Sequence, residues 1–118
     1  MNQIDSQLSL CQEWSVFLQK RGHAMLGSKS AGLCISSKDA VGKRYRWVPL
    51  AATGATRSIG AEEKDELALQ LRYALKRSES CFLVTWFPAP INRVIVLPVS
   101  RALKVGRVDS RKGGIPWD

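Results

Sequence analysis

An almost continuously apolar stretch, CFLVTWF at residues 81–87, constrains the fold more than any other feature of this chain. A strand with one solvated face alternates apolar and polar residues, whereas a strand buried on both faces is apolar along its whole length. Residues 81–87 are therefore predicted to form a central strand of a sheet that has helices packed on it.

Two helices are predicted. Apolar residues recur at three- and four-residue steps over residues 6–20, and Gly22 follows as a stop signal. A second helix is expected from the acidic run at residues 62–66 to about Arg77, because carboxylates are stabilised at the positive N-terminal end of a helix. Helix formation thus explains the acidic run without a catalytic role.

The remaining strands are short. Strand character is found at residues 23–27, 32–37, 44–50 and 93–97. Polar residues and glycine at 38–43 predict a hairpin loop, and residues 100–103 suggest a helical turn. The predicted order is α-β-β-β-α-β-β, which is typical of an α+β fold with a mixed β-sheet. With 118 residues, the chain is expected to be a single domain, 1–118, with a basic, glycine-rich tail at 104–118.

Charge sets the classes of partner that the chain can attract. Eighteen Lys and Arg against ten Asp and Glu give a net charge of +8, and a positive field attracts polyanions. Nucleic acid, an anionic membrane and an acidic protein are the candidate classes. No stretch approaches the roughly 20 apolar residues of a membrane-spanning helix, so no spanning segment is expected, and nucleic acid is preferred to a membrane as partner. Three widely spaced cysteines predict buried thiols rather than a zinc site, and a cytoplasmic setting is expected.

Two segments, EWSVFLQKRGH at residues 13–23 and GKRYRWVPL at residues 42–50, are similar to segments of a known family. They resemble the first helix and the third strand of the family of restriction-endonuclease-like, or PD-(D/E)xK, nucleases. FLVTW at 82–86 and VIVLP at 94–98 resemble its later hairpin. The resemblance covers roughly residues 10–100 and implies a restriction-endonuclease-like fold.

The chain departs from this family at the catalytic motif. The family needs carboxylates on adjacent strands to hold Mg²⁺, and a lysine to assist the attack on phosphate. The resemblance places the E-x-K positions at Val48 and Leu50, and the preceding Asp position at Ala31 or Gly32. Such side chains cannot bind a hard cation. No cofactor is therefore expected, and binding is favoured over catalysis.

Basic residues on the third strand, in its hairpin and near the C-terminus form a candidate phosphate-binding groove. Strand alternation places Arg44 and Arg46 on one side with Val48, and Tyr45 and Trp47 on the other. Either the arginines are simply solvated, or they join the other bases in contacting phosphates. The candidate residues are Lys43, Arg44, Arg46, Arg101, Lys104, Arg107, Arg111 and Lys112.

The sequence leads to one main hypothesis and two alternatives. The main hypothesis is a catalytically silent, nuclease-like domain that binds nucleic acid, DNA rather than RNA, through phosphate contacts. The first alternative is a protein-interaction module, a subunit or inhibitor that docks on an acidic partner or forms a homodimer through a sheet edge. The second is a Mg²⁺-dependent nuclease with relocated carboxylates, for which Glu13 and Asp39 are the candidate ligands. Trp117 is expected to dock the tail on the body or to stack on a base.

Overall fold

The structure, a computed structural model, describes residues 3–26, 34–111 and 113–117. The helices are α1 (Gln3–Lys20), α2 (Ala61–Lys76) and α3 (Val99–Val105). The strands are β1 (Ala24–Leu26), β2 (Ile35–Lys38), β3 (Arg44–Ala51), β4 (Thr56–Ser58), β5 (Glu79–Phe87), β6 (Arg93–Pro98), β7 (Arg107–Asp109) and β8 (Ile115–Pro116). In the described part of the chain, none of the helices combines the length and apolar character needed to cross a membrane.

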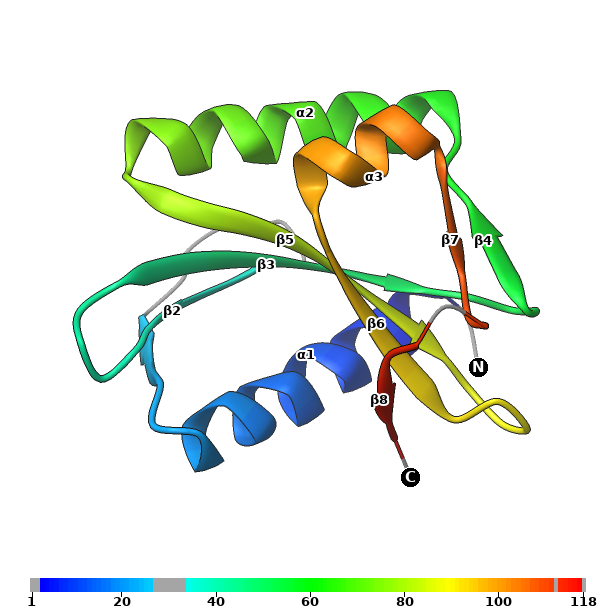
Figure 1. Cartoon of the computed structure of the whole chain (residues 1–118), viewed down its shortest axis with the longest axis horizontal. Coiled ribbons are helices and arrows are strands. Elements are labelled where there is room, and N and C mark those ends of the chain that lie inside the picture. The colour runs from blue at the N-terminus through cyan, green and yellow to red at the C-terminus, as the bar shows by residue number, and fades with distance from the viewer. Residues whose placement is uncertain (1–2, 27–33, 112, 118) are drawn as a thin grey trace.

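A mixed sheet forms the middle layer of the molecule. Its strand order is β1-β2-β3-β5-β6-β8, with β3 and β5 parallel and the other neighbouring pairs antiparallel. Helix α1 packs on one face, whereas α2 and α3 lie side by side on the other (Figure 1). The predicted α+β class, mixed sheet and α-β-β-β-α-β-β order are confirmed for the elements that the sequence pattern identifies.

Strand β5 is the central strand that its apolar sequence predicts. It lies between β3 and β6, and its side chains alternate between two cores. Val84 joins the core under α1 with Leu10 and Trp14, whereas Leu83 and Phe87 join the core under α2. Because both faces of β5 are covered by helices, the strand contains few polar residues.

Three short strands are not predicted by the sequence pattern. Strands β4 and β7 pair in a separate two-stranded sheet, and β8 pairs with the outer edge of β6. Each has only two or three residues, too few for a periodic pattern. At Gly114, where φ is +109°, a Cβ atom would lie 2.8 Å from the carbonyl oxygen of Val94, so glycine is needed for β8 to approach β6.

The C-terminal tail docks on the body through Trp117. Its ring centroid lies 5.7 Å from that of Trp14 and 5.4 Å from that of Phe17, both in α1. The backbone N–H of Trp117 also donates a hydrogen bond to the carbonyl of Asn92 at 2.8 Å. Trp117 therefore has the docking role, and its partly buried ring belongs to the core under α1.

Arg46 is buried, which corrects its expected place on a solvated face of β3. Alternation along β3 is as predicted, but α2 covers the face that carries Arg46, and only 6% of the residue is exposed. Its Nε donates to Glu79 Oε1 at 2.9 Å, and its Nη1 donates to Gln70 Oε1 at 2.8 Å. Burial acts to lower the pKa of Arg46, but the hydrogen bond and the charge of Glu79, together with the nearby thiols of Cys34 and Cys81, outweigh it and the pKa is raised. Arg46 is thus a charged interior residue that does not fit the predicted phosphate-binding role.

Removal of Glu79 should destabilise the fold strongly. The substitution Glu79→Ala leaves the Arg46 guanidinium buried without its counter-ion, so we expect a loss of about 3–5 kcal/mol in the free energy of unfolding. Urea denaturation measures this loss. The double variant Arg46→Met/Glu79→Leu removes both charges and should recover much of the stability. An unfolding free energy for Glu79→Ala close to that of the wild type would contradict the assignment.

Candidate nucleic-acid interface

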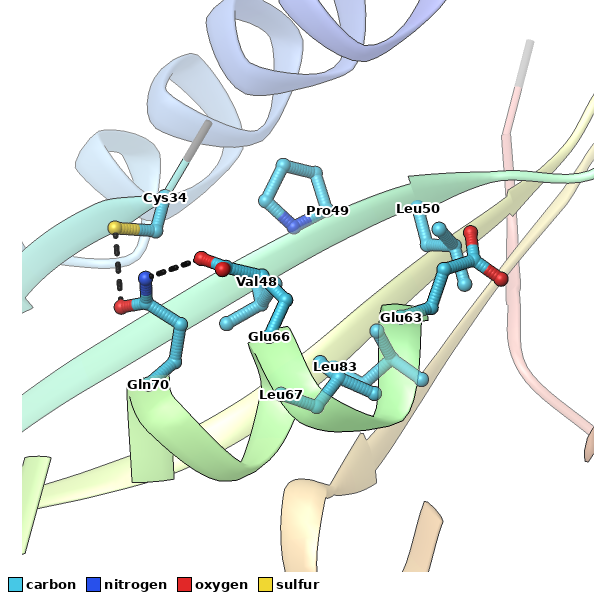
Figure 2. A pocket seen from close by; sticks show the side chains of 9 residues that line it. All are labelled: Cys34, Val48, Pro49, Leu50, Glu63, Glu66, Leu67, Gln70 and Leu83. Atoms are coloured by element: carbon cyan, nitrogen blue, oxygen red, sulfur yellow. Dashed lines mark hydrogen bonds between the residues drawn. The ribbon is translucent and has the colours of Figure 1, made fainter. Parts of the chain in front are cut away.

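Val48 and Leu50, which the sequence resemblance places at the E-x-K positions, line an apolar cavity between β3 and α2. Val48 and Leu50 face a space of about 190 Å³, which α2 borders on its other side (Figure 2). The other lining residues are Cys34, Pro49, Glu63, Glu66, Leu67, Gln70 and Leu83. The expected Asp positions, Ala31 and Gly32, lie outside the described residues. The first described residue of that segment, Cys34, contributes its thiol to the cavity wall.

Polar groups in the cavity form a chain across α2. The Cys34 thiol donates to Gln70 Oε1 at 3.6 Å, and Gln70 Nε2 donates to Glu66 Oε1 at 2.9 Å (Figure 2). Gln70 also accepts from Arg46, so this amide joins the interior ion pair to an exposed carboxylate. These polar groups are thus hydrogen-bonded to one another, and they do not converge on a common point where a metal ion could bind.

Glu63, at the other end of the cavity, is committed to the start of α2. Its Oε1 accepts hydrogen bonds from Gly60 N–H and Arg57 Nη1, each at 3.0 Å, and its Oε2 pairs with Arg57 Nη2. Burial acts to raise the pKa of Glu63, but the hydrogen bonds from Arg57 and Gly60 outweigh it and the pKa is lowered. The acidic run thus has the structural role at the helix start that the sequence predicts for it.

The cavity does not fit the Mg²⁺ ion of the family it resembles. Mg²⁺ requires an octahedral shell of oxygen ligands, whereas the motif positions carry the hydrocarbon side chains of Val48 and Leu50. Of the two carboxylates on the rim, that of Glu63 is neutralised by Arg57. Within the described ranges, no group of three or more His, Cys, Asp or Glu side chains is arranged to hold a metal ion.

The two carboxylates of the nuclease alternative lie in separate surroundings. Asp39 closes the β2–β3 hairpin, where its carboxylate accepts from Val41 N–H, Lys43 N–H and the Tyr45 hydroxyl at 2.9 to 3.1 Å. Slight burial acts to raise its pKa, but these bonds outweigh it and the pKa is lowered. Glu13 is exposed on α1, beside a surface depression that Trp117 also lines. Asp39 is therefore hydrogen-bonded within its own hairpin, whereas Glu13 lies on the surface of α1 beside a different set of residues.

Exposed bases gather at one end of the sheet, which we call the basic end. Strand pairing places Ala24, which begins β1, opposite Lys38, and Lys38 opposite Arg44. Arg44 is in turn opposite Glu79, the first residue of β5, so the C-terminus of α2 lies at the same end. Figure 1 shows the β2–β3 hairpin and the ends of α1 and α2 together on the left. The basic end consists of Lys20, Arg21, Lys38, Lys43, Arg44, Lys76 and Arg77, all of which are exposed.

Acidic residues at the basic end are already engaged in the fold. Asp39 is held by its own hairpin, and Glu79 is buried against Arg46. The end of α1 is fixed to the sheet where His23 Nδ1 lies 2.9 Å from Ser37 Oγ. Because the carboxylates are turned to internal partners, the exposed charge of this end is dominated by Lys and Arg.

The predicted phosphate-binding residues do not form one groove. Lys43 and Arg44 belong to the basic end, whereas α3, β7 and the turn that follows β7 carry the C-terminal candidates Arg101, Lys104, Arg107 and Arg111. In Figure 1 these C-terminal elements lie on the right, next to the acidic start of α2. Arg111 forms an exposed ion pair with Asp109 at 3.3 Å, and Lys112 lies outside the described residues.

Five bases of the basic end are absent from the set that the sequence indicates. They are Lys20, Arg21, Lys38, Lys76 and Arg77. Each is explained locally as a base at a helix end or in a loop, where cations are favourable or solvated. The order of the elements could have indicated them, because each of these helix ends leads into a strand of the sheet close to the β2–β3 hairpin.

Comparison with known proteins identifies the fold. No protein-family model matches the sequence, and no curated protein matches it significantly. Among solved structures, the chain is similar to Hjc, a Holliday junction resolvase from the archaeal hyperthermophile Archaeoglobus fulgidus, with a TM-score of 0.57 and 16% sequence identity. The similarity covers 75% of this chain and 75% of the resolvase chain. The fold is thus restriction-endonuclease-like, as the sequence resemblance implies.

The Arg57–Glu63 pair should make the free energy of unfolding fall as the pH is lowered into the acid range. Because the folded-state pKa of Glu63 is lowered, its ionised form stabilises the fold above the unfolded pKa, and this contribution is lost as pH falls through the folded pKa. At pH 7, Glu63→Gln should lower the free energy of unfolding by about 0.5–1 kcal/mol. Urea titrations at several pH values should show the difference from wild type closing below about pH 4. A difference that persists unchanged under strongly acidic conditions would contradict the role of the ion pair.

Proposed function

We propose that this chain is a catalytically silent, restriction-endonuclease-like domain that binds DNA through phosphate contacts at its basic end. The observation that carries the proposal is the gathering of exposed Lys and Arg from the end of α1, the β2–β3 hairpin and the end of α2 at one end of the sheet, where the acids are engaged internally. Lys and Arg neutralise backbone phosphates and release counterions, which gives affinity that is largely independent of base sequence.

DNA is favoured over other polyanions by the fold. The solved structure that this chain resembles is a Holliday junction resolvase, and the Holliday junction is a branched form of DNA. The proposed function is binding without cleavage, because the side chains of Val48 and Leu50 at the motif positions cannot bind a metal ion. Docking on an acidic protein remains the alternative, and it would be favoured if DNA did not bind.

Phosphate binding at the basic end predicts a specific salt dependence. A labelled duplex should bind at low salt, with log affinity falling linearly as log salt rises. The variant Lys43→Ala/Arg44→Ala should bind more weakly and should reduce the magnitude of this slope by roughly 2, one for each lost phosphate contact. Fluorescence anisotropy over a salt series measures both quantities.

The matched control is Arg101→Ala/Lys104→Ala, which removes the same charge from exposed positions of α3. Its affinity and salt slope should stay close to those of the wild type. Equal losses in the two variants would show that net charge, rather than the basic end, determines binding. No binding of any DNA at about 50 mM salt would overturn the proposed function.

Absence of cleavage is a separate expectation. Plasmid and four-way junction DNA incubated with Mg²⁺ or Mn²⁺ should remain intact, because the apolar cavity offers no ligand set for the ion. Gel electrophoresis after long incubation measures the outcome. Metal-dependent cleavage that disappears in Glu66→Gln would establish a relocated catalytic centre at the cavity rim and contradict catalytic silence.

A further inference from the structure

The last turns of α2 present a tyrosine among three bases on their outer face. Arg72, Tyr73, Lys76 and Arg77 are spaced i, i+1, i+4 and i+5, so they lie together on a helix surface. All four are exposed, and Tyr73 keeps 40% of its surface open to solvent. The guanidinium carbon of Arg77 lies 5.7 Å from the centre of the Tyr73 ring. An aromatic ring is thus held in a strongly positive surface.

Packing does not account for Tyr73. The neighbouring Leu71 and Ala74 are directed to the core under α2, whereas Tyr73 belongs to neither of the two hydrophobic cores formed by the described residues. The other tyrosine is different, because Tyr45 stacks on Trp47 at 5.3 Å and donates to Asp39. Tyr73 therefore lies outside both cores, and 40% of the residue is exposed to solvent.

Unpaired nucleotides have the chemistry that complements this surface. Proteins that bind single strands combine a positive track for the phosphates with aromatic side chains on which bases stack. Bases inside a duplex are already stacked on each other and cannot present their faces to a side chain without being flipped out. A ring flanked by Arg72, Lys76 and Arg77 can contact a base while the cations contact the adjoining phosphates.

We infer that Tyr73 is a base-stacking position, and that the outer face of α2 binds single-stranded DNA. The inference rests on the proposed function and specifies the form of DNA that the basic end takes, because Lys76 and Arg77 belong to both surfaces. Single strands, or the unpaired arms of a branched molecule, are then preferred to an uninterrupted duplex.

The test compares a labelled oligothymidylate of about 15 nucleotides, a length within the range of single-strand sites, with a duplex of the same length. Anisotropy titrations at one low salt concentration should show tighter binding of the single strand. Tyr73→Leu should weaken single-strand binding by roughly fivefold or more, which is the smallest effect expected for a lost base stack. Tyr73→Phe keeps the ring and should retain the affinity, whereas duplex binding should be similar in all three proteins.

The outcomes separate this inference from the proposed function. If duplex and single strand both bind but Tyr73→Leu leaves the single-strand affinity unchanged, stacking at Tyr73 is refuted while phosphate binding stands. Equal affinity of the wild type for the two forms refutes the single-strand preference in the same way. If neither form binds, both the proposed function and the inference fail. Thermal unfolding of each variant checks that the exposed substitution leaves the fold intact.

Discussion

The buried ion pair between Arg46 and Glu79 is the interaction on which the rest of the structure depends. It joins the two parallel strands at the centre of the sheet and, through Gln70, ties them to α2. Two interior charges are tolerated only when each is paired and hydrogen-bonded. The pair therefore fixes α2 over β3. In this position α2 covers Val48 and Leu50, which form part of the apolar wall of the cavity. The apolar cavity beside β3 and the burial of this pair both depend on the position of α2 over the sheet.

Much of the fold follows from local patterns, whereas the environment of Arg46 does not. The apolar run of β5, the periodicity of α1 and the acidic start of α2 each predict an element at nearly its observed position. Strand alternation also separates Tyr45 and Trp47 from Arg46 correctly. Alternation identifies the two faces of a strand, but it does not say whether a helix covers each one. Glu79, which makes burial of Arg46 possible, lies 33 residues further along the chain, so no local pattern could reveal the pair.

The candidate interface shows the same division between local and long-range information. Net charge indicated a polyanion as partner, and Lys43 and Arg44 were visible as a basic hairpin. The bases that join them come from the ends of two helices, and only the pairing of β1, β2, β3 and β5 brings those ends together. By contrast, the bases near the C-terminus are close to one another in sequence but lie across the molecule from the hairpin (Figure 1).

Helix α2 begins with carboxylates and ends with cations, and its 16 residues span about 24 Å along the molecule, whose longest extent is 35 Å (Figure 1). These side-chain charges oppose the intrinsic dipole of the helix and add to the bases at the tips of α1 and the hairpin. The side chains of α2 should thus contribute an electric moment directed along the helix, from its acidic start to the basic end. In the field of a polyanion such a moment produces a torque, which turns the protein before any contact forms. Under the proposed function, collisions with DNA would then begin with the basic end forward, which would raise the fraction of encounters that lead to binding.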